Sequence, residues 1–350
     1  MTILKPLHGD EPFLYENLRT FCDQDYPHFQ IVFGTLLLHD PALQAVHRLQ
    51  REFPACDIAI VSQSAASGGR NPKVVNLQRM EHAAKHDLLV IADSDMRVGR
   101  DYLESLAEAF QNERTGAATC LYGALGVDGL PSLIGAMHVN DQFAPSVLVA
   151  LALEPLRYCF GATMAVRRAT LNRIGGLAAL AANLGDDYLL GKLVSDAGER
   201  VALCRHLPHT IVADCDLRDV WSRELRWART IRSARPLGYA GSILTHPLML
   251  AACNALLRRS FASGVILGAA LALRVALHAE ATKTFAARRR VTPWLIPVRD
   301  ASAAALWIGG LFGSRVRWRE SEFQLRGAAM RPTSDGSSPS ERRSGQTPLQ

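Results

Sequence analysis

The sequence predicts an α/β domain followed by a hydrophobic, helical C-terminal region. From residue 1 to about residue 235, short apolar runs alternate with amphipathic stretches, as a sheet covered by helices requires. Beyond residue 247, three longer apolar segments follow, bordered by basic residues. We therefore expect an α/β domain at residues 1–236, a membrane-associated helical region at 237–326, and a disordered tail rich in serine, proline and arginine at 327–350.

The elements of the α/β domain are expected in the following order. The strands are Thr2 to Leu4, Gln30 to Leu36, Asp57 to Val61, Leu88 to Ala92, Ala117 to Tyr122 and Gly161 to Val166. The helices between them are Glu11 to Cys22, Pro41 to Phe53, Val74 to Ala84, Asp101 to Gln111 and Leu184 to Ala197. Gly198 is the stop signal of the last of these helices, and a further helix is expected from about Asp219 to Ala234.

The C-terminal apolar segments run from about Leu248 to Leu257, Ser260 to Leu277 and Trp294 to Phe312. None is an uninterrupted apolar run of about 20 residues, the length that crosses a bilayer as a helix. Charged residues bound or interrupt all three, namely Arg258, Arg259, Arg274, Arg299 and Asp300. We expect membrane contact, and the sequence leaves spanning, re-entrant and interfacial placements open.

Cysteine usage and basic blocks indicate the compartment. The seven cysteines are odd in number and contain no C-x-x-C pair, so we expect reduced thiols, a cytoplasmic domain and no zinc site. Met1 begins a short apolar run that we expect to be the first strand rather than a signal peptide. The basic blocks beside the apolar segments usually mark a cytoplasmic face; they are Lys283 with Arg288 to Arg290, and Arg315, Arg317 and Arg319.

The net charge of +6 indicates the class of partner. The 39 basic residues exceed the 33 acidic residues mainly after Arg205, which predicts contact with phosphate groups or an anionic membrane. A nucleic-acid partner is not expected, because no basic run is interleaved with stacking aromatic residues. The eleven histidines show no metal-ligand spacing, and the sequence assigns them no role.

The strongest local signal is Asp93-Ser94-Asp95, which follows a buried-type strand. Residues i and i+2 of an extended chain point to the same side, so the two carboxylates can converge where the strand leaves the sheet. Ligands of open α/β sheets bind at such carboxyl ends. Two carboxylates there suit a divalent ion that binds a diphosphate. The alternative is an ordinary aspartate-rich turn that caps the next helix.

A second acidic site, Asp186-Asp187, lies at the beginning of a predicted helix. Acids in a first turn are often simple partners of the helix dipole. The functional alternative is a general base that takes the proton from an acceptor hydroxyl during attack on a sugar.

The third site is Arg223-Glu-Leu-Arg226-Trp227, within the helix expected at 219–234. Arg223 and Arg226 are three residues apart, so they share a helix face and could grip a diphosphate. Alternatively, Arg226 forms a solvated or lipid-contacting basic face together with Arg229 and Arg232.

Two weaker candidates precede these sites. Asp40 lies between a predicted strand and a predicted helix, where it either caps the helix or contacts a nucleotide. The loop from Gly68 to Lys73 contains Asn71 and Lys73 and suits contacts to a base and to phosphate, although such loops are common.

In this order, the motifs resemble those of inverting glycosyltransferases of the ceramide glucosyltransferase type. The resemblance covers about Thr2 to Leu248. It rests on Leu4 to Gly9, Asp40-Pro41-Ala42, Asn71-Pro72-Lys73 with Asn76-Leu77, Asp93 to Asp95, Asp187-Tyr188 and Arg223 to Trp227. It implies a GT-A fold, the Rossmann-like mixed sheet of nucleotide-diphospho-sugar transferases, with hydrophobic C-terminal helices.

Within that group, the motif sequences are most similar to those of bacterial hopanoid-biosynthesis-associated glycosyltransferases. The stretches concerned are Ala92 to Gly99, Phe160 to Arg168, and Glu224 to Arg232 running on to His246-Pro247-Leu248. The resemblance implies a UDP-sugar donor, with UDP-N-acetylglucosamine expected, and a hopanoid polyol such as bacteriohopanetetrol as the lipid acceptor. It also implies the cytoplasmic side of a bacterial inner membrane.

The resemblance assigns a role to each motif residue. Asp40, Asn71 and Lys73 would contact the donor, and Asp93 and Asp95 would hold Mg²⁺ or Mn²⁺ at the diphosphate. Asp187 would be the catalytic base of a single displacement with inversion, while Arg223, Arg226 and Trp227 would close over the diphosphate and acceptor. A ceramide glucosyltransferase, a nucleotidyltransferase that releases pyrophosphate and a non-catalytic membrane scaffold are the rival hypotheses.

The sequence departs from the family pattern in two places. The residues before Asp40 are usually Asp or Gln in the family, whereas Leu36, Leu37, Leu38 and His39 stand here. A change in donor affinity is therefore expected. Family members also usually begin with a membrane helix, so we expect the anchor to be C-terminal or the gene start to be misplaced.

Overall fold

The computed structural model describes residues 1–64, 68–285, 294–318, 321–326 and 329–332. Its centre is a seven-stranded mixed sheet in the order β3-β2-β1-β4-β8-β6-β9. β1 to β4 are parallel, and β8 runs antiparallel to both of its neighbours, β4 and β6. These strands are β1 (Thr2–Pro6), β2 (Gln30–Thr35), β3 (Asp57–Ser62), β4 (Leu88–Ala92), β6 (Thr115–Cys120), β8 (Thr163–Arg167) and β9 (Arg200–Cys204). The predicted α/β class is confirmed.

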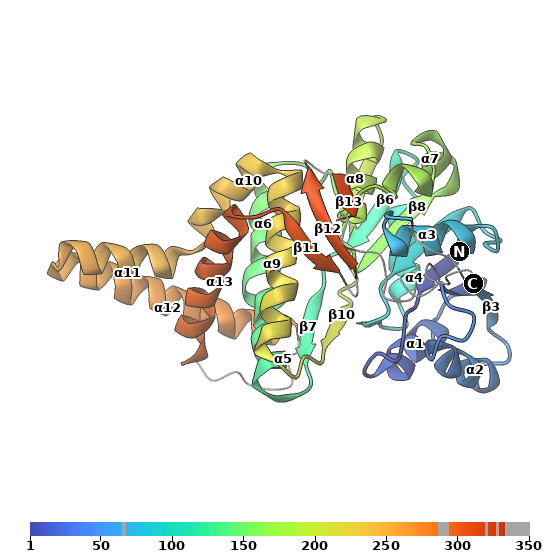
Figure 1. Cartoon of the computed structure of the whole chain (residues 1–350), viewed down its shortest axis with the longest axis horizontal. Helices are drawn as coiled ribbons and strands as arrows, with labels where there is room; N and C mark the ends of the chain where they lie inside the picture. Colours follow the sequence, from blue (N-terminus) through green and yellow to red (C-terminus); the bar gives the residue numbers. More distant parts are fainter. Residues whose placement is uncertain (65–67, 286–293, 319–320, 327–328, 333–350) are drawn as a thin grey trace, which may run out of the picture.

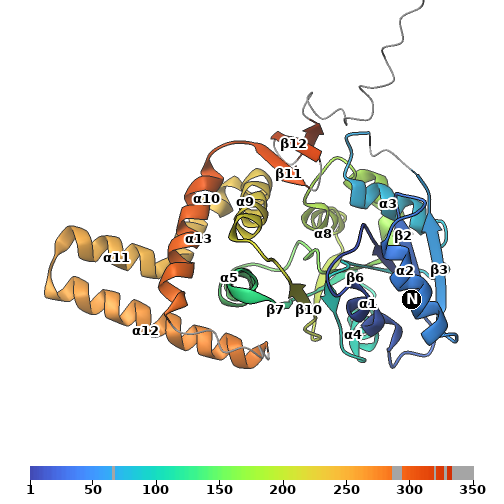
Figure 2. The same ribbon diagram turned by 60° about the horizontal axis from the view of Figure 1, so that its bottom comes forward.

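Helices cover both faces of this sheet (Figures 1 and 2). Alternate strand residues point to opposite faces, so Val90 of β4 belongs to one core cluster and Ile91 to the other. The first face packs against α1 (Leu14–Cys22), α2 (Ala42–Glu52) and α4 (Tyr102–Ala109). The second packs against α3 (Pro72–Glu81), α7 (Arg168–Arg173) and α8 (Asp186–Asp196).

A second layer lies beside the carboxyl ends of the main sheet, between it and the C-terminal helices (Figure 1). It contains a small sheet in the order β5-β10-β7 and a helical run that begins with α5. Its elements are β5 (Met96–Arg97), β7 (Gly123–Gly126), β10 (His209–Val212), α5 (Gly129–His138), the π-helical turn η1 (Val139–Phe143), α6 (Ala144–Leu153) and α9 (Leu217–Ala234), whereas the 3₁₀ turn η2 (Leu177–Leu180) packs on the second face of the main sheet. Of these, only α9 was predicted from the sequence.

The three predicted apolar segments are helices, and a hairpin of two of them projects from the body (Figures 1 and 2). This region consists of α10 (Pro236–Gly241), the 3₁₀ turn η3 (Ser242–Thr245), α11 (Pro247–Arg258), α12 (Phe261–Thr284) and α13 (Leu295–Leu311). Among the described residues, one helix, α12, is long and apolar enough to cross a membrane. The pair α10–η3 and α11 passes the same test only together, with a bend of 65°.

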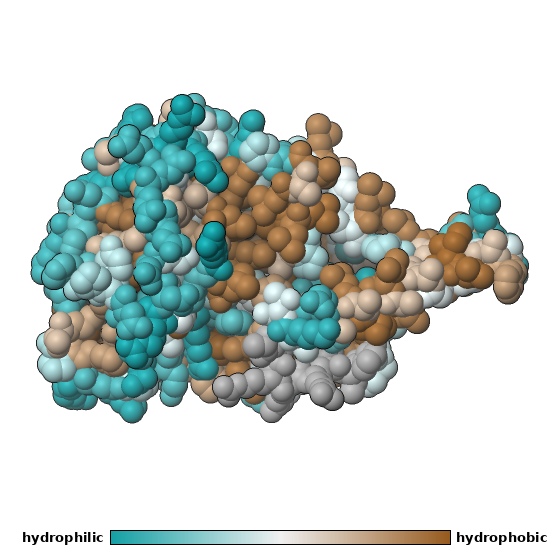
Figure 3. Space-filling view, turned by 180° about the vertical axis from the view of Figure 1, so that it is seen from behind, coloured by the Kyte–Doolittle hydropathy of each residue, from teal (hydrophilic) through white to brown (hydrophobic). Residues whose placement is uncertain are grey.

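The hydrophobic surface extends beyond this hairpin. Seen from behind, apolar side chains gather across the middle of the molecule and along the projecting arm (Figure 3). Large apolar side chains are strongly exposed at several helices, among them Leu153 of α6, Leu237 of α10, Leu257 of α11 and Phe261 of α12. Contiguous exposed apolar surface of this kind is typical of a protein or membrane contact.

Arg229 and Arg232 do not form the solvated or lipid-contacting face that was one alternative for them. Arg229 donates to the carbonyl oxygens of Phe312 and Arg315, and Arg232 donates to those of Leu311 and Gly313. The last carbonyls of a helix have no partner within the helix, and cations stabilise them. The two arginines therefore tie the end of α13 to α9.

The disordered tail was predicted to begin at residue 327, which is too early in the chain. A third sheet of β11 (Arg315–Trp318), β12 (Ser321–Arg326) and β13 (Ala329–Pro332) extends past residue 327. Alternating side chains of β12 supply its core, where Phe323 and Leu325 pack with Val316 and with Leu184. Residues 333–350, and the predicted basic block Arg288 to Arg290, lie outside the described residues.

Candidate active site

The carboxylates of Asp93, Asp95, Asp186 and Asp187, called the acid site below, lie near one another at the carboxyl end of β4. The turn that carries Asp93 is held from β1, because the buried Lys5 ammonium donates to the Asp93 carbonyl oxygen. Burial lowers the pKa of Lys5 to about 7, although the nearby acids counteract it.

Lys73 joins the two acidic motifs. Its Nζ lies 2.7 Å from Asp93 Oδ1 and 3.6 Å from Asp186 Oδ2. Burial alone would lower the pKa of Lys73, but Asp186 and Asp93 outweigh it and raise that pKa. Lys73 is placed by the beginning of α3, where Asn71 Oδ1 accepts from the backbone N–H groups of Lys73 and Val74.

Gly161 allows Asp187 to face Asp93. A Cβ atom at Gly161 would lie 3.3 Å from Asp187 Oδ2 and 3.6 Å from Asp93 Oδ2. The two carboxylate oxygens therefore border the same small space, where the chain turns into β8. Any side chain at this position would enter the gap between the acids.

The acid site is crowded with negative charge. Burial, followed by the charge of Asp93, raises the pKa of Asp95 to about 6, while the Thr210 hydroxyl donates to Asp95 Oδ2 at 2.7 Å. Burial, followed by the charge of Asp186, raises the pKa of Asp187 to about 6. A carboxylate with such a pKa is well matched to a general base that works near neutral pH.

The residues present fit a divalent ion. Asp93 and Asp95 supply hard oxygen ligands, and the repulsion between them is what a cation would relieve. Within the described ranges no group of three or more His, Cys, Asp or Glu is placed to hold a metal. Water and diphosphate oxygens would therefore complete the coordination, as is usual for Mg²⁺ bound with a nucleotide.

The motif on α9 borders the same region. Arg223 Nη1 donates to both carboxylate oxygens of Asp214, each at 2.5 Å, and its guanidinium lies 5.4 Å from the centre of the Trp227 ring. Thr230, one turn beyond Arg226, lies beside Gly185. A Cβ atom added at Gly185 would lie 3.6 Å from the Thr230 methyl group. This face of α9 therefore approaches the beginning of α8, where Asp187 lies.

Asp40 caps the helix that follows it, and its predicted contact to a nucleotide stays a prediction. Its Oδ1 accepts from the backbone N–H groups of Ala42 and Gly9, so it caps α2 and fixes the loop after β1. Its buried Oδ2 has no hydrogen-bond partner among the described residues, although His8 lies 4.0 Å away. A ligand donor would satisfy this oxygen.

The amide of Asn71 is fully occupied. Besides capping α3, it donates from Nδ2 to the carbonyl oxygen of Asn183, which lies just before the Asp186-Asp187 motif. Asn71 thus ties the α3 loop to the α8 loop, and its predicted contact to the donor stays a prediction.

Several residues of the site were not singled out individually from the sequence. Lys5, Gly161 and Asp186 act through contacts between distant strands and loops, which spacing along the chain does not reveal. Tyr122 is another: burial, then the charges of Asp187, Asp95 and Asp93, raise the pKa of its phenol, so its ring lies in the field of three acids. A tyrosine at the last position of a predicted strand is the one signal that could have indicated it.

Comparisons with known proteins agree with this geometry. The family described as "Glycosyl transferase family 21" matches residues 1–330. Ceramide glucosyltransferase 1 of Caenorhabditis elegans is 23% identical over 230 residues, which are 65% of this chain and 49% of that protein. Ceramide glucosyltransferase 3 of the same organism is 20% identical over 349 residues, covering 93% of this chain and 72% of that protein.

A solved structure shares the fold. The mannosyltransferase PcManGT from Pyrobaculum calidifontis, in complex with GDP-Man and Mn²⁺, superposes with a TM-score of 0.51 at 20% identity. The match covers 89% of this chain and 85% of that chain. The GT-A architecture expected from the sequence motifs is confirmed.

Proposed function

The chain belongs to glycosyl transferase family 21, and from this premise we propose that it is an inverting transferase that moves a sugar from a UDP-sugar to a lipid hydroxyl. One observation carries the proposal: the Asp187 and Asp93 carboxylates border one space across Gly161. A base and a diphosphate-binding acid on two sides of one cavity are what a single displacement requires.

In the proposed reaction, Asp187 accepts the proton of the lipid hydroxyl as that oxygen bonds to the anomeric carbon of the sugar. The bond between this carbon and the diphosphate oxygen breaks on the opposite side, so UDP leaves with the bonding electrons and the configuration inverts. The raised pKa of Asp187 makes the carboxylate basic enough to take the proton.

The acids of the β4 turn and the α9 motif serve the leaving group. Asp93 and Asp95 would hold a divalent ion, Mg²⁺ or Mn²⁺, which would neutralise charge on the departing diphosphate. Lys73, which pairs with Asp93, is proposed to contact the same phosphates. Arg223, Arg226 and Trp227 are proposed to close over the diphosphate and acceptor from α9, and Asp40 to contact the uridine.

We assign N-acetylglucosamine as the sugar and a hopanoid polyol such as bacteriohopanetetrol as the acceptor. The similarity of the three longer motif stretches to hopanoid-associated enzymes supports this choice. The exposed apolar surface and the α11–α12 hairpin support a lipid acceptor taken from a membrane (Figure 3). The proposed location is the cytoplasmic side of a bacterial inner membrane.

Ceramide with UDP-glucose is the second candidate. It is favoured by the names of the relatives, which are ceramide glucosyltransferases. The alignment with the first of them spans about half of that protein's length, so its activity is carried over here only as a proposal.

The deciding experiment is UDP release by the detergent-solubilised full chain with Mg²⁺ or Mn²⁺. UDP-N-acetylglucosamine and UDP-glucose are each tested with bacteriohopanetetrol and with ceramide, and Asp187→Asn protein is the control. Acceptor-dependent release with UDP-N-acetylglucosamine and bacteriohopanetetrol is expected. Release with UDP-glucose and ceramide selects the second candidate, pyrophosphate release indicates a nucleotidyltransferase, and absence of any UDP-sugar binding indicates a non-catalytic scaffold.

A further inference from the structure

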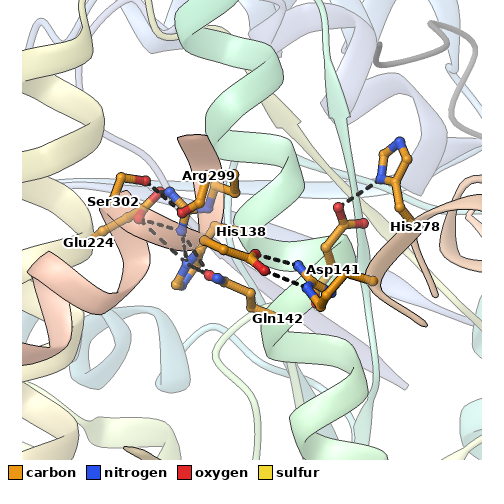
Figure 4. A network of polar contacts seen from close by, with 9 residues as sticks. His138, Asp141, Gln142, Glu224, His278, Arg299 and Ser302 are labelled. Atoms are coloured by element: carbon orange, nitrogen blue, oxygen red, sulfur yellow. Dashed lines mark hydrogen bonds and ion pairs between the residues drawn. The ribbon is translucent and has the colours of Figure 1, made fainter. Parts of the chain in front are cut away.

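A buried network of polar side chains, called the helix network below, connects the hydrophobic helices to the motif helix α9 (Figure 4). Its members are His138, Asp141, Gln142, Glu224, Arg274, His278, Arg299 and Asp300. At its centre lies Arg299 of α13, whose side chain is 1% exposed. Arg299 donates to Glu224 Oε2 at 2.7 Å, to Glu224 Oε1 at 3.3 Å and to Gln142 Oε1 at 2.9 Å. Glu224 is the second residue of the Arg223-to-Trp227 motif.

The same guanidinium orients a histidine. Arg299 Nη2 lies 2.5 Å from His138 Nδ1, so this nitrogen accepts and the ring carries its proton on Nε2. Burial and the charge of Arg299 hold the pKa of His138 well below its usual range, which keeps the imidazole neutral. The lone pair on Nδ1 and the fixed guanidinium together set the plane of the ring.

His138 transmits this orientation to the motif. Its ring stacks on Trp227, with centroids 5.6 Å apart and planes 26° from parallel. The Arg223 guanidinium packs against Trp227 in turn, and Asp214 fixes the far end of Arg223. Arg299, His138, Trp227 and Arg223 therefore form one continuous series of contacts from a hydrophobic helix to the candidate active site.

We infer that Arg299 and His138 are positioning residues that hold Trp227 and Arg223 ready for the donor diphosphate. The inference rests on the proposed function, which places these two motif residues at the diphosphate. Neither Arg299 nor His138 touches the acid site in the contacts described, so both act through the motif.

The rest of the helix network fixes the frame in which this series lies. Asp300, next to Arg299 on α13, binds Arg274 of α12 through two bonds of 2.6 and 2.7 Å. Arg274 also donates to the backbone of Asp141, whose carboxylate binds His278 at 2.7 Å. Asp141 and Gln142 belong to the π-helical turn η1, a distortion that recurs at functional sites in proteins.

Stability alone does not explain the choice of residues. Replacing a buried ion pair by well-packed apolar side chains is often neutral or stabilising. An apolar contact between α9 and α13 would hold the helices together, but it would not fix the tilt of one histidine ring. The directional bonds of Arg299 do so, and the ring they orient is the one that stacks on the motif tryptophan.

Two buried histidines of the helix network allow a matched test. His138→Ala removes the ring that stacks on Trp227, whereas His278→Ala removes a ring that binds the Asp141 carboxylate. In full-length detergent-solubilised protein, we expect His138→Ala to lower kcat for sugar transfer at least about tenfold, because motif groups are misplaced. His278→Ala should leave kcat near the wild-type value even where it lowers the melting temperature. His138→Phe, which keeps a stacking ring but cannot accept from Arg299, should recover only part of the lost kcat.

A second measurement does not depend on activity. In protein labelled with 5-fluorotryptophan, the fluorine resonance of Trp227 is assigned by its loss in Trp227→Phe. It should shift or broaden in His138→Ala and Arg299→Met and stay unchanged in His278→Ala. An unmoved Trp227 signal, or equal kcat losses in the two histidine variants, overturns the inference. Inactive wild-type protein in which the Trp227 signal still responds as expected overturns the proposed function instead.

Discussion

The acid site and the helix network are both clusters of charged side chains, yet their charges are arranged in opposite ways. In the helix network each buried cation faces one carboxylate, Arg299 with Glu224 and Arg274 with Asp300, at bonded distances and with exposures of 7% or less. In the acid site Lys73 is at ion-pair distance from two of the four carboxylates, Asp93 and Asp186. Buried cations and carboxylates are paired one to one in the first arrangement, whereas carboxylates outnumber the nearby cations, Lys5 and Lys73, in the second.

The difference separates structural charge from functional charge. Charges that are paired one to one fix the geometry of the helices. Unbalanced carboxylates raise one another's pKa, as at Asp95 and Asp187, and that is the condition that favours a cation, a proton or both. Substitutions in both regions test this separation.

The largest effect is expected for Asp187→Asn. The amide cannot accept the proton of the acceptor hydroxyl, so kcat for transfer should fall about 10²- to 10⁴-fold. The amide also removes a repulsive charge, so binding of UDP with Mn²⁺ should be largely kept. Initial rates of UDP release and calorimetric UDP binding measure the two quantities. Equal loss of binding and transfer would refute the role of Asp187 as base.

Arg274→Met is expected to have the next largest effect, on folding. It leaves the Asp300 carboxylate buried without its partner, which destabilises a protein by about 3–5 kcal/mol. The double variant Arg274→Met/Asp300→Leu should recover most of this loss. Asp95→Asn at the acid site should instead raise the melting temperature of the ligand-free protein, because it relieves burial of a charge beside Asp93. Thermal unfolding in detergent compares the three variants; the pairing argument fails when the double variant is no more stable than Arg274→Met.

The two regions were also unequally predictable from sequence. The strand Leu88–Ala92 was predicted with its observed bounds, because a continuous apolar run that is followed by two aspartates indicates a buried strand that ends there. The catalytic candidates Asp93 and Asp187 were found because each ends or begins an element. Their partners were not: Gly161 reaches them because β8 returns antiparallel beside β4, a pairing that no local spacing encodes.

The helix network escaped prediction for a related reason. From sequence, Arg274, Arg299 and Asp300 were interruptions of apolar segments, and His138 had no role. Their partners lie 26 to 161 residues away, on other helices. The whole stretch from β7 to α6 was likewise unassigned, because α6 is apolar on all sides and lacks a periodic signal. Polar residues in apolar runs become informative only once their partners are known.

Two glycines, Gly161 and Gly191, provide a further test with a smaller expected effect. Gly161→Ala places a Cβ 3.3 Å from Asp187 Oδ2, in the space between the acids, so kcat/KM should fall by up to about 10²-fold with little loss of stability. Gly191→Ala places a Cβ against the Tyr158 backbone, nearer than Cβ atoms approach, and should destabilise folding by about 1–3 kcal/mol. Steady-state kinetics and thermal unfolding of both variants separate these outcomes. A large stability loss in Gly161→Ala would show that its role is packing.

The smallest expected effect is a shift in the pH dependence of kcat/KM. Asp187 is a base only when deprotonated, and its pKa is raised to about 6, so kcat/KM should fall as pH decreases below about 6. Lys73 lowers this pKa, so Lys73→Met should move the acidic limb to higher pH. Stability changes in the opposite direction: the folded chain binds this proton more tightly than the unfolded chain, so acidification through pH 6 relieves a cost of folding. A pH–rate profile checks the shift, and an acidic limb that stays in place in Lys73→Met would assign it to a carboxyl outside the reach of Lys73.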